Sequence, residues 1–235
     1  AQLSAQTPNA FAQYTRTGDD KLGGMSVNRF GGFLKRSWRV NDWTWGRVDA
    51  ASHLCRVVLH PARIRRTAQL VGFLPAAGEG VSAEPAARGA AEATVTEIVE
   101  RLFPAELQDD PRIVALRDRA IRELTPVLNP TKPAEDLDAA LPALADLFAW
   151  ALHLEIVPSE LPALAGAVRA DGVDGANARS YGEVFVEEHE PLLTRLDRHR
   201  RGEGELTPQD RIAALEAFDR AIELESGAYR FRETR

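Results

Sequence analysis

Apolar residues recur at three- and four-residue steps along most of this chain, and no stretch shows the strict alternation that a half-buried strand requires. Thr207-Pro208 with Asp210 is the strongest helix start, because the threonine caps, the proline fits the first turn and the acid completes a capping box. The pattern predicts a mainly α fold whose later helices form an antiparallel bundle. The expected helices cover residues 94–103, 111–124, 134–157, 159–169, 183–200 and 207–226.

Composition divides the chain into four parts of different character. The first part is polar, the second is rich in Trp and Arg, the third is rich in Pro, Gly and Ala, and the fourth is acidic with helical periodicity. We therefore expect a linker or disordered start, a Trp/Arg-rich segment, a second linker or surface loop, and an acidic helical bundle. These parts span residues 1–19, 20–74, 75–92 and 93–235.

Charge is distributed unevenly along the chain, which carries a net −6. Residues 1–70 contain 11 Lys and Arg against 4 Asp and Glu, whereas residues 71–235 contain 18 against 31. The basic part can meet an anionic surface such as lipid headgroups, or it can dock on the acidic part of the same chain. Both interpretations remain open, while the acidic total argues against a nucleic-acid partner.

The cysteine count and the hydropathy pattern indicate the setting of the chain. The single Cys55 cannot form an internal disulfide and fits a reducing compartment. No run of about 18 apolar residues is present, and no signal peptide is visible near Ala1. We expect a cytoplasmic location, with peripheral contact at a membrane left open. The polar, non-Met start favours a position inside a longer reading frame over a trimmed terminus.

No catalytic motif can be assigned in this sequence. A serine nucleophile needs a Gly-x-Ser-x-Gly elbow, and the sequences around Ser26 and Ser82 each lack the second glycine. Asp42, Asp49 and His53 share one face of a predicted helix and could hold a metal, although such residues more often cap helices and pair with arginine. No catalytic residue, metal or cofactor is therefore expected. An unrecognised enzyme within the helices remains a third interpretation.

Three of the four tryptophans lie within residues 30–49, together with two phenylalanines and several arginines. Tryptophan is costly to leave in water, so Trp38, Trp43 and Trp45 are expected to be buried or to contact something large. Gly46 between bulky residues suggests the close approach of another backbone. A local core and an interface are equally compatible with this cluster. Its candidate residues are Phe30, Phe33, Trp38, Arg39, Asn41, Asp42, Trp43, Trp45, Gly46, Arg47 and Asp49.

A compact basic patch follows the Trp-rich helix, which is expected to begin at an N-cap at Asn41 or Asp42 and to end before Pro61. The patch, residues 60–66, can contact anionic lipid or nucleic acid. Alternatively it caps a helix end or pairs with the acidic helices. Its candidate anion contacts are Arg63, Arg65 and Arg66.

A family resemblance rests on three motifs in order. These are Lys21-Leu22-Gly23-Gly24, Phe30-Gly31-Gly32-Phe33 and Trp38-Arg39-x-Asn41-Asp42-Trp43-x-Trp45-Gly46-Arg47-x-Asp49. Together they resemble the signature on the C-terminal side of bacterial patatin-like proteins, where a domain of unknown function follows the phospholipase domain. The resemblance covers residues 20–60 well and is weaker over residues 91–235.

The resemblance implies a parent protein that hydrolyses acyl esters of lipids with a Ser–Asp dyad. The family's serine elbow would lie upstream of Ala1. Asp174-Gly175-Ala176 has the letters of the family's aspartate motif, but it follows the signature instead of preceding it, so no catalytic residue is carried over.

The expected function is that of a non-catalytic accessory region of a patatin-like lipid acyl hydrolase. In this hypothesis residues 20–60 pack against the upstream catalytic domain, and the acidic helices regulate, shield or recruit. The alternative is a free-standing helical module for protein–protein interaction, which uses the same Trp/Arg surface. The aromatic contacts would be Phe30, Phe33, Trp38, Trp43 and Trp45.

Overall fold

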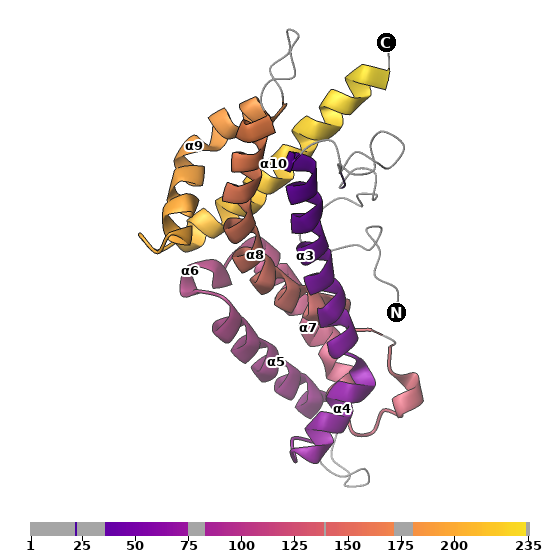
Figure 1. The fold of residues 1–235 in the computed structure, drawn as a ribbon. Coiled ribbons are helices and arrows are strands. Elements are labelled where there is room, and N and C mark those ends of the chain that lie inside the picture. The colour runs from indigo at the N-terminus through magenta and orange to yellow at the C-terminus, as the bar shows by residue number, and fades with distance from the viewer. Residues whose placement is uncertain (1–21, 23–35, 75–82, 139, 172–180, 234–235) are drawn as a thin grey trace. The chain divides into compact units, whose positions relative to one another are not determined.

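The computed structural model describes residues 22, 36–74, 83–138, 140–171 and 181–233. This part of the chain is mainly helical and contains no strand, which confirms the predicted fold class (Figure 1). The α-helices are α3 (Arg36–Val58), α4 (Pro61–Leu70), α5 (Ala83–Leu102), α6 (Ala105–Gln108), α7 (Pro111–Leu128), α8 (Pro142–Asp171), α9 (Tyr181–Arg200) and α10 (Pro208–Glu233), with a 3-10 turn, η3 (Ala134–Asp136), before α8.

The described residues form two compact units. Unit 1 comprises Ser52–Ala151, and unit 2 combines α3 up to Ala51 with the segment from Leu152 onwards. Two helices, α3 and α8, therefore contribute residues to both units. No helix in the described ranges is both long enough and apolar enough to cross a bilayer.

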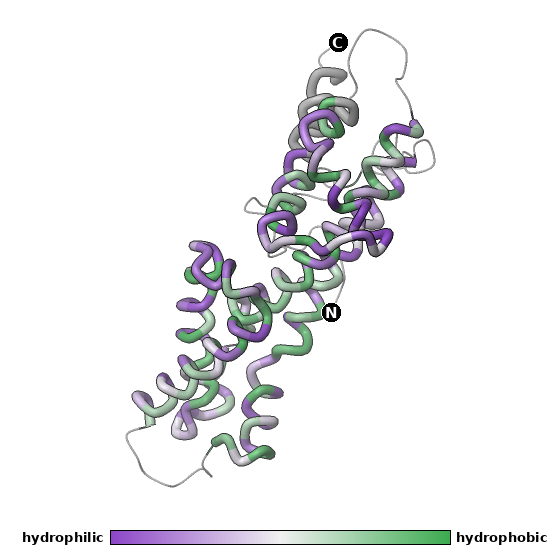
Figure 2. Tube along the Cα trace, turned by 90° about the vertical axis from the view of Figure 1, so that its left-hand side faces the viewer, coloured by the Kyte–Doolittle hydropathy of each residue, from purple (hydrophilic) through white to green (hydrophobic). Residues whose placement is uncertain are grey.

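Unit 1 is built around α5 and α7, which α6 joins into an antiparallel pair, and α4 also packs on α7. Small and branched residues at four-residue steps on α5 are fully or nearly buried and form its inner face. The first part of α8 adds Trp150, whose ring centroid lies 6.3 Å from that of Phe103. Arg112 stacks on the same indole at 4.8 Å. Figure 2 shows hydrophilic and hydrophobic residues interspersed along the helices.

Unit 2 contains the hairpin of α9 and α10, which pack against each other. The predicted capping box is present at its turn. Thr207 Oγ1 accepts from the amide of Asp210 at 3.1 Å, and the Asp210 carboxylate accepts from the Thr207 amide at 3.2 Å. Arg195 of α9 donates to Asp210 at 2.8 Å, which ties the two helices together beside the turn. The predicted start of this helix is confirmed.

The start of α3 differs from the sequence prediction. The helix begins at Arg36 and not after an N-cap at Asn41 or Asp42. Asp171, the last residue of α8, supplies the cap, because its carboxylate accepts from the amides of Arg36 and Ser37 at 3.1 and 2.8 Å. A carboxylate so distant in sequence cannot be recognised from the local pattern.

Residues 83–92 were placed in the predicted linker, but they form the first half of α5. Alanine is the strongest helix former, and five of these ten residues are alanine. Pro85 falls in the first turn of the helix, where the missing N–H removes no hydrogen bond. Helix propensity therefore outweighs the loop signal of the Pro and Gly residues.

The separate helices expected at residues 134–157 and 159–169 are joined in one helix, α8, which continues through Pro158 and Pro162, and α9 continues through Pro191. Pro158 cannot donate to the carbonyl of Leu154. Arg211 of α10 donates to that oxygen instead, at 3.2 Å. A side chain from another helix thus satisfies the acceptor that Pro158 leaves open.

Candidate interaction surfaces on α3 and α4

One face of the first half of α3 forms a local core in unit 2. Trp38, Asn41, Trp45 and Val48 follow helical spacing and are all buried, with Trp45 at 0% exposure. The Trp45 ring lies 5.0 Å from that of Phe218 on α10, in a tilted arrangement. Of the two interpretations of the Trp cluster, a local core describes this face.

The opposite face of α3 carries Trp43, which is 64% exposed. The described part of the chain does not bury it, because two residues along a helix turn the side chain about 200° away from Trp45, and its expected contact with something large stays a prediction. Arg39 and Gly46 are also exposed on this part of α3. Arg47, which precedes Val48, pairs with Glu160 of α8. An exposed indole beside cationic side chains has the composition of an interface centre.

Gly46 does not mark the close approach of another backbone. Apart from its chain neighbours and the backbone of α3 itself, no described atom lies within 4 Å of the position that a Cβ would occupy at this residue. Gly46 is exposed, so the expectation of tight packing there is wrong within the described chain. Its lack of a side chain leaves the indole of Trp43, one turn earlier, less covered than a larger residue would.

The remaining signature residues differ in how far they are buried, and some lie outside the described residues. Asn41 and Asp49 are buried, and Asp42 is half-buried. Phe30 and Phe33 lie outside the described residues, as do Ser26, Ser82 and Asp174-Gly175-Ala176. Within the described ranges no group of three or more His, Cys, Asp and Glu side chains is arranged to hold a metal ion, including Asp42, Asp49 and His53.

The three arginines of the basic patch have different environments on α4. Arg63 and Arg66 are exposed, whereas Arg65 is only 6% exposed. The Arg65 guanidinium donates to the carbonyl of Asn129, which directly follows α7. A cation at this helix end offsets the partial negative charge of the last carbonyls. Arg65 is therefore a structural contact and not an anion contact on the surface, which was the alternative for this patch.

Large apolar side chains are exposed at the end of α4. Leu70 is 76% exposed, Val71 is 72% exposed, and Phe73 in the following turn is 51% exposed. We call these three residues the apolar tip. No sequence motif marks these residues, although Gly72, which follows the end of the helix, lies among them. The last turns of α3 add further exposed apolar residues to unit 1, namely Leu54, Val57 and Val58.

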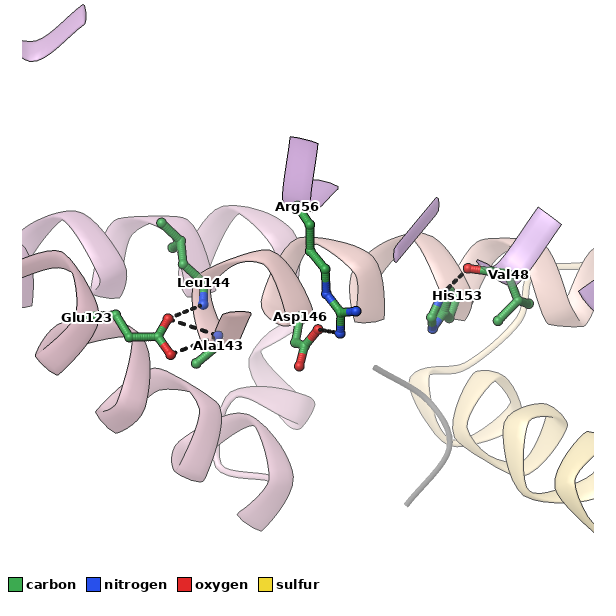
Figure 3. Close-up of polar contacts among 7 residues, drawn as sticks. All are labelled: Val48, Arg56, Glu123, Ala143, Leu144, Asp146 and His153. Atoms are coloured by element: carbon green, nitrogen blue, oxygen red, sulfur yellow. Dashed lines mark hydrogen bonds and ion pairs between the residues drawn. The ribbon is translucent and has the colours of Figure 1, made fainter. Parts of the chain in front are cut away.

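Half-buried ionisable groups in unit 1 have structural partners (Figure 3). The Glu123 carboxylate accepts from the amides of Ala143 and Leu144 at 2.8 and 3.2 Å and so caps the start of α8. Burial raises the pKa of Glu123, although these two hydrogen bonds oppose the rise. Arg56 donates to Asp146 at 3.1 Å, and burial nevertheless raises the pKa of Asp146.

The lone cysteine lies close to this pair. Burial raises the pKa of Cys55, and the nearby negative charge of Asp146 raises it further. A thiol with a raised pKa is protonated at neutral pH and is a poor nucleophile. The hydrogen bond from Arg56 to Asp146 links α3 to α8 within unit 1.

His153 is the buried histidine of unit 2. Its Nε2 donates to the carbonyl of Val48 at 3.0 Å, as Figure 3 shows, and the residue is 0% exposed. Burial lowers the pKa of His153 to about 4, and the hydrogen bond to Val48 offsets only part of that effect. The neutral ring thus fastens α8 to α3 at physiological pH. No sequence motif pointed to this contact.

A shallow groove between α5 and α7 gathers charged side chains in unit 1. Cations and acids occur there in equal number, and Arg88 pairs with Glu92 at 2.9 Å. The groove therefore has no net charge that would attract a charged ligand. The charged residues of the groove are Glu84, Arg88, Glu92, Arg117, Asp118 and Arg122.

Residues 1–112 match a protein family described as "Protein of unknown function (DUF3376)". The chain is also 50% identical over 64 residues to the "Uncharacterized membrane protein Rv3479" of Mycobacterium tuberculosis (strain ATCC 25618 / H37Rv). That match covers 27% of this chain and only 6% of the relative, so the chain spans a small part of the curated relative's length. No solved structure matches.

The family match includes both surfaces described above, since α3 and α4 lie within residues 1–112. A domain of unknown function was predicted for this part of the chain, and that prediction is confirmed. The link to patatin-like proteins stays a prediction.

Proposed function

We propose that this chain is a non-catalytic accessory region of a larger patatin-like lipid acyl hydrolase. The exposed face of α3 around Trp43 packs on the catalytic domain of that protein. The observation that carries the proposal is the 64% exposure of Trp43 on a helix whose opposite face is already a complete core. Leaving an indole in water is unfavourable, and exposed Trp beside Arg is typical of binding surfaces.

Two further facts support a role inside a larger protein. The relative from Mycobacterium tuberculosis is far longer than the matched segment, which is 6% of its length. The motifs between Lys21 and Asp49 resemble the signature that follows the phospholipase domain in patatin-like proteins. The basic character of residues 1–70 also agrees with a place in a lipid hydrolase, because such an enzyme works next to anionic lipid headgroups.

The first test is the reading frame upstream of Ala1. The proposal expects an open frame that encodes a Gly-x-Ser-x-Gly elbow after a strand-like run. A stop codon followed by a local start would contradict the hydrolase. The alternative function, a free-standing helical module that binds a separate protein through Trp43, would then account for the exposed indole.

The second test is oxidative footprinting of the tryptophans in the isolated chain and in the full-length parent. Trp43 should be oxidised readily in the isolated chain and protected when the catalytic domain is present. Trp45 is the internal control, because it is buried within unit 2 and should be protected in both samples. Equal oxidation of Trp43 in the two samples would show that this face does not dock.

A further inference from the structure

Among the described residues of unit 1, the apolar tip at the end of α4 carries the most exposed large hydrophobic side chains. Leu70 and Val71 are 76% and 72% exposed, and Phe73 is half exposed. These side chains are consecutive apart from Gly72, so they form a single local protrusion. Isolated exposed apolar residues are ordinary, but a branched pair next to a phenylalanine needs a partner.

The backbone holds the tip in a fixed shape. Gly72 has a φ of 71°, which only glycine adopts readily, and it ends α4 in a Schellman motif. The Phe73 amide donates to Ala68 O at 2.8 Å, and the Gly72 amide donates to Gln69 O at 3.1 Å. Leu74 is buried immediately afterwards and anchors the turn. The tip is therefore preorganised, so binding does not have to order it.

Two exposed arginines precede the apolar tip on α4. Arg63 and Arg66 are exposed and precede Leu70 by seven and four residues, which places all three on one side of α4. No acidic residue occurs between Asp49 and Glu79, although the chain as a whole is acidic. The tip thus lies in a wholly cationic stretch of an anionic protein.

The cationic side chains beside the apolar tip favour an anionic partner over a second copy of this chain. A second copy of the same surface would bring arginines against arginines, which is unfavourable in a two-fold contact. Peripheral membrane elements, by contrast, combine exposed apolar side chains with flanking Arg or Lys that contact lipid phosphates. We propose that the apolar tip inserts into the interface of an anionic bilayer, with Arg63 and Arg66 on the headgroup phosphates.

The proposal does not depend on the docking of Trp43 or on a hydrolase parent, because it concerns α4 and uses none of the same residues. The local cations explain how a chain of net −6 could approach an anionic membrane. Each arginine near such a surface strengthens binding by roughly fivefold. The apolar side chains should make the remaining affinity insensitive to salt.

The test is flotation of the 235-residue chain with vesicles of phosphatidylcholine alone or with about one third phosphatidylglycerol. The chain should float with the anionic vesicles only. The double variants Leu70→Ser/Val71→Ser and Arg63→Gln/Arg66→Gln should each lose binding by roughly tenfold or more. These side chains are exposed, so both variants should unfold at the parent's urea midpoint.

Matched controls alter similar side chains elsewhere. Leu152→Ser changes an exposed leucine of α8, and Arg101→Gln changes an arginine of α5 whose side chain is 77% exposed. Both controls should bind like the parent. If the chain does not float with anionic vesicles, or if the tip variant floats as well as the parent, the proposal is wrong. Self-association that the tip variant abolishes, without vesicle binding, would also overturn it.

Insertion depth provides an independent readout. In Phe73→Trp the added indole should be quenched by lipids brominated near the headgroup when anionic vesicles are present. The four native tryptophans are measured in the parent chain and subtracted. Flotation without this quenching would mean that the arginines bind the surface while the tip stays in water, which contradicts the insertion.

Discussion

Trp45 is a large, fully buried side chain in the core of unit 2. Its ring lies 5.0 Å from that of Phe218. Trp43, only two positions earlier, is mostly exposed. Trp45 therefore packs in the core, whereas the side chain of Trp43 remains available to a partner.

Replacing Trp45 with alanine should lower the free energy of unfolding by about 3–5 kcal/mol, because the change leaves a large cavity beside Phe218. Urea unfolding of the isolated chain measures the effect. Trp43→Ala is the matched control and should change stability by about 0.5 kcal/mol or less. Coincident unfolding midpoints for Trp45→Ala and the parent would disprove the burial of Trp45.

His153 should make the stability of the chain depend on pH. Its pKa is lowered from 6.5 to about 4 in the folded state, so the unfolded state binds a proton more readily between these values. The contribution of neutral His153 is therefore complete above pH 6.5 and falls as the pH drops towards 4. The loss should total roughly 3 kcal/mol over that window.

Acidic groups also titrate in this range, so the effect of His153 is measured as the difference in stability between the parent and a variant. Urea unfolding of the parent and of His153→Gln is followed from pH 7 to pH 4, since glutamine can still donate to Val48 O but does not ionise. The parent should lose stability relative to the variant as the pH falls. Parallel curves would mean that His153 is protonated as easily in the folded chain as in the unfolded one.

At the scale of the helices, the start of α8 depends on a residue of another helix. Glu123 of α7 accepts from the first free amides of α8 at Ala143 and Leu144. Glu123→Gln removes the charge that favours a helix N-terminus and should cost about 1 kcal/mol. Amide hydrogen exchange at Ala143 and Leu144 should accelerate. Glu100→Gln, at an exposed position on α5, is the control and should leave that exchange unchanged.

Local signals in the sequence predicted helices well where the caps are local. Thr207 and Asp210 lie three residues apart, so their capping box could be read directly. The caps of α3 and α8 come from Asp171 and Glu123, which no local pattern reveals. The continuity of α8 through Pro158 likewise depends on Arg211, a residue on a different helix.

The candidate surfaces were predicted only in part, for the same physical reason. The sequence indicated a Trp-rich helix and a basic patch, but not which side of each helix would be covered. Trp43 is exposed and Arg65 is buried, and the sequence pattern alone did not decide between the alternatives for either residue. The apolar tip could have been predicted from the sequence. Leu70 and Val71 come just before Gly72, a residue typical of helix C-termini, and they follow Arg63 and Arg66.

At the scale of the whole molecule, the family match and the compact units have different boundaries. The match ends at Arg112, the second residue of α7, whereas unit 1 extends to Ala151. A fragment of residues 1–112 would keep α5 without most of its partner α7. We expect this fragment to show no cooperative urea transition by circular dichroism, in contrast to the full chain. A sigmoidal transition in the fragment would mean that the matched segment folds by itself.

The contact between Trp45 and Phe218 also has a consequence for the order of events on the ribosome. Trp45 lies near the beginning of the chain and Phe218 near its end, yet their rings pack together. At ~5–20 residues per second, the segment between them takes on the order of ten seconds or more to emerge. Throughout that interval the indole of Trp45 cannot reach its native neighbour. A nascent chain therefore carries Trp45 without its native neighbour until Phe218 has left the ribosome.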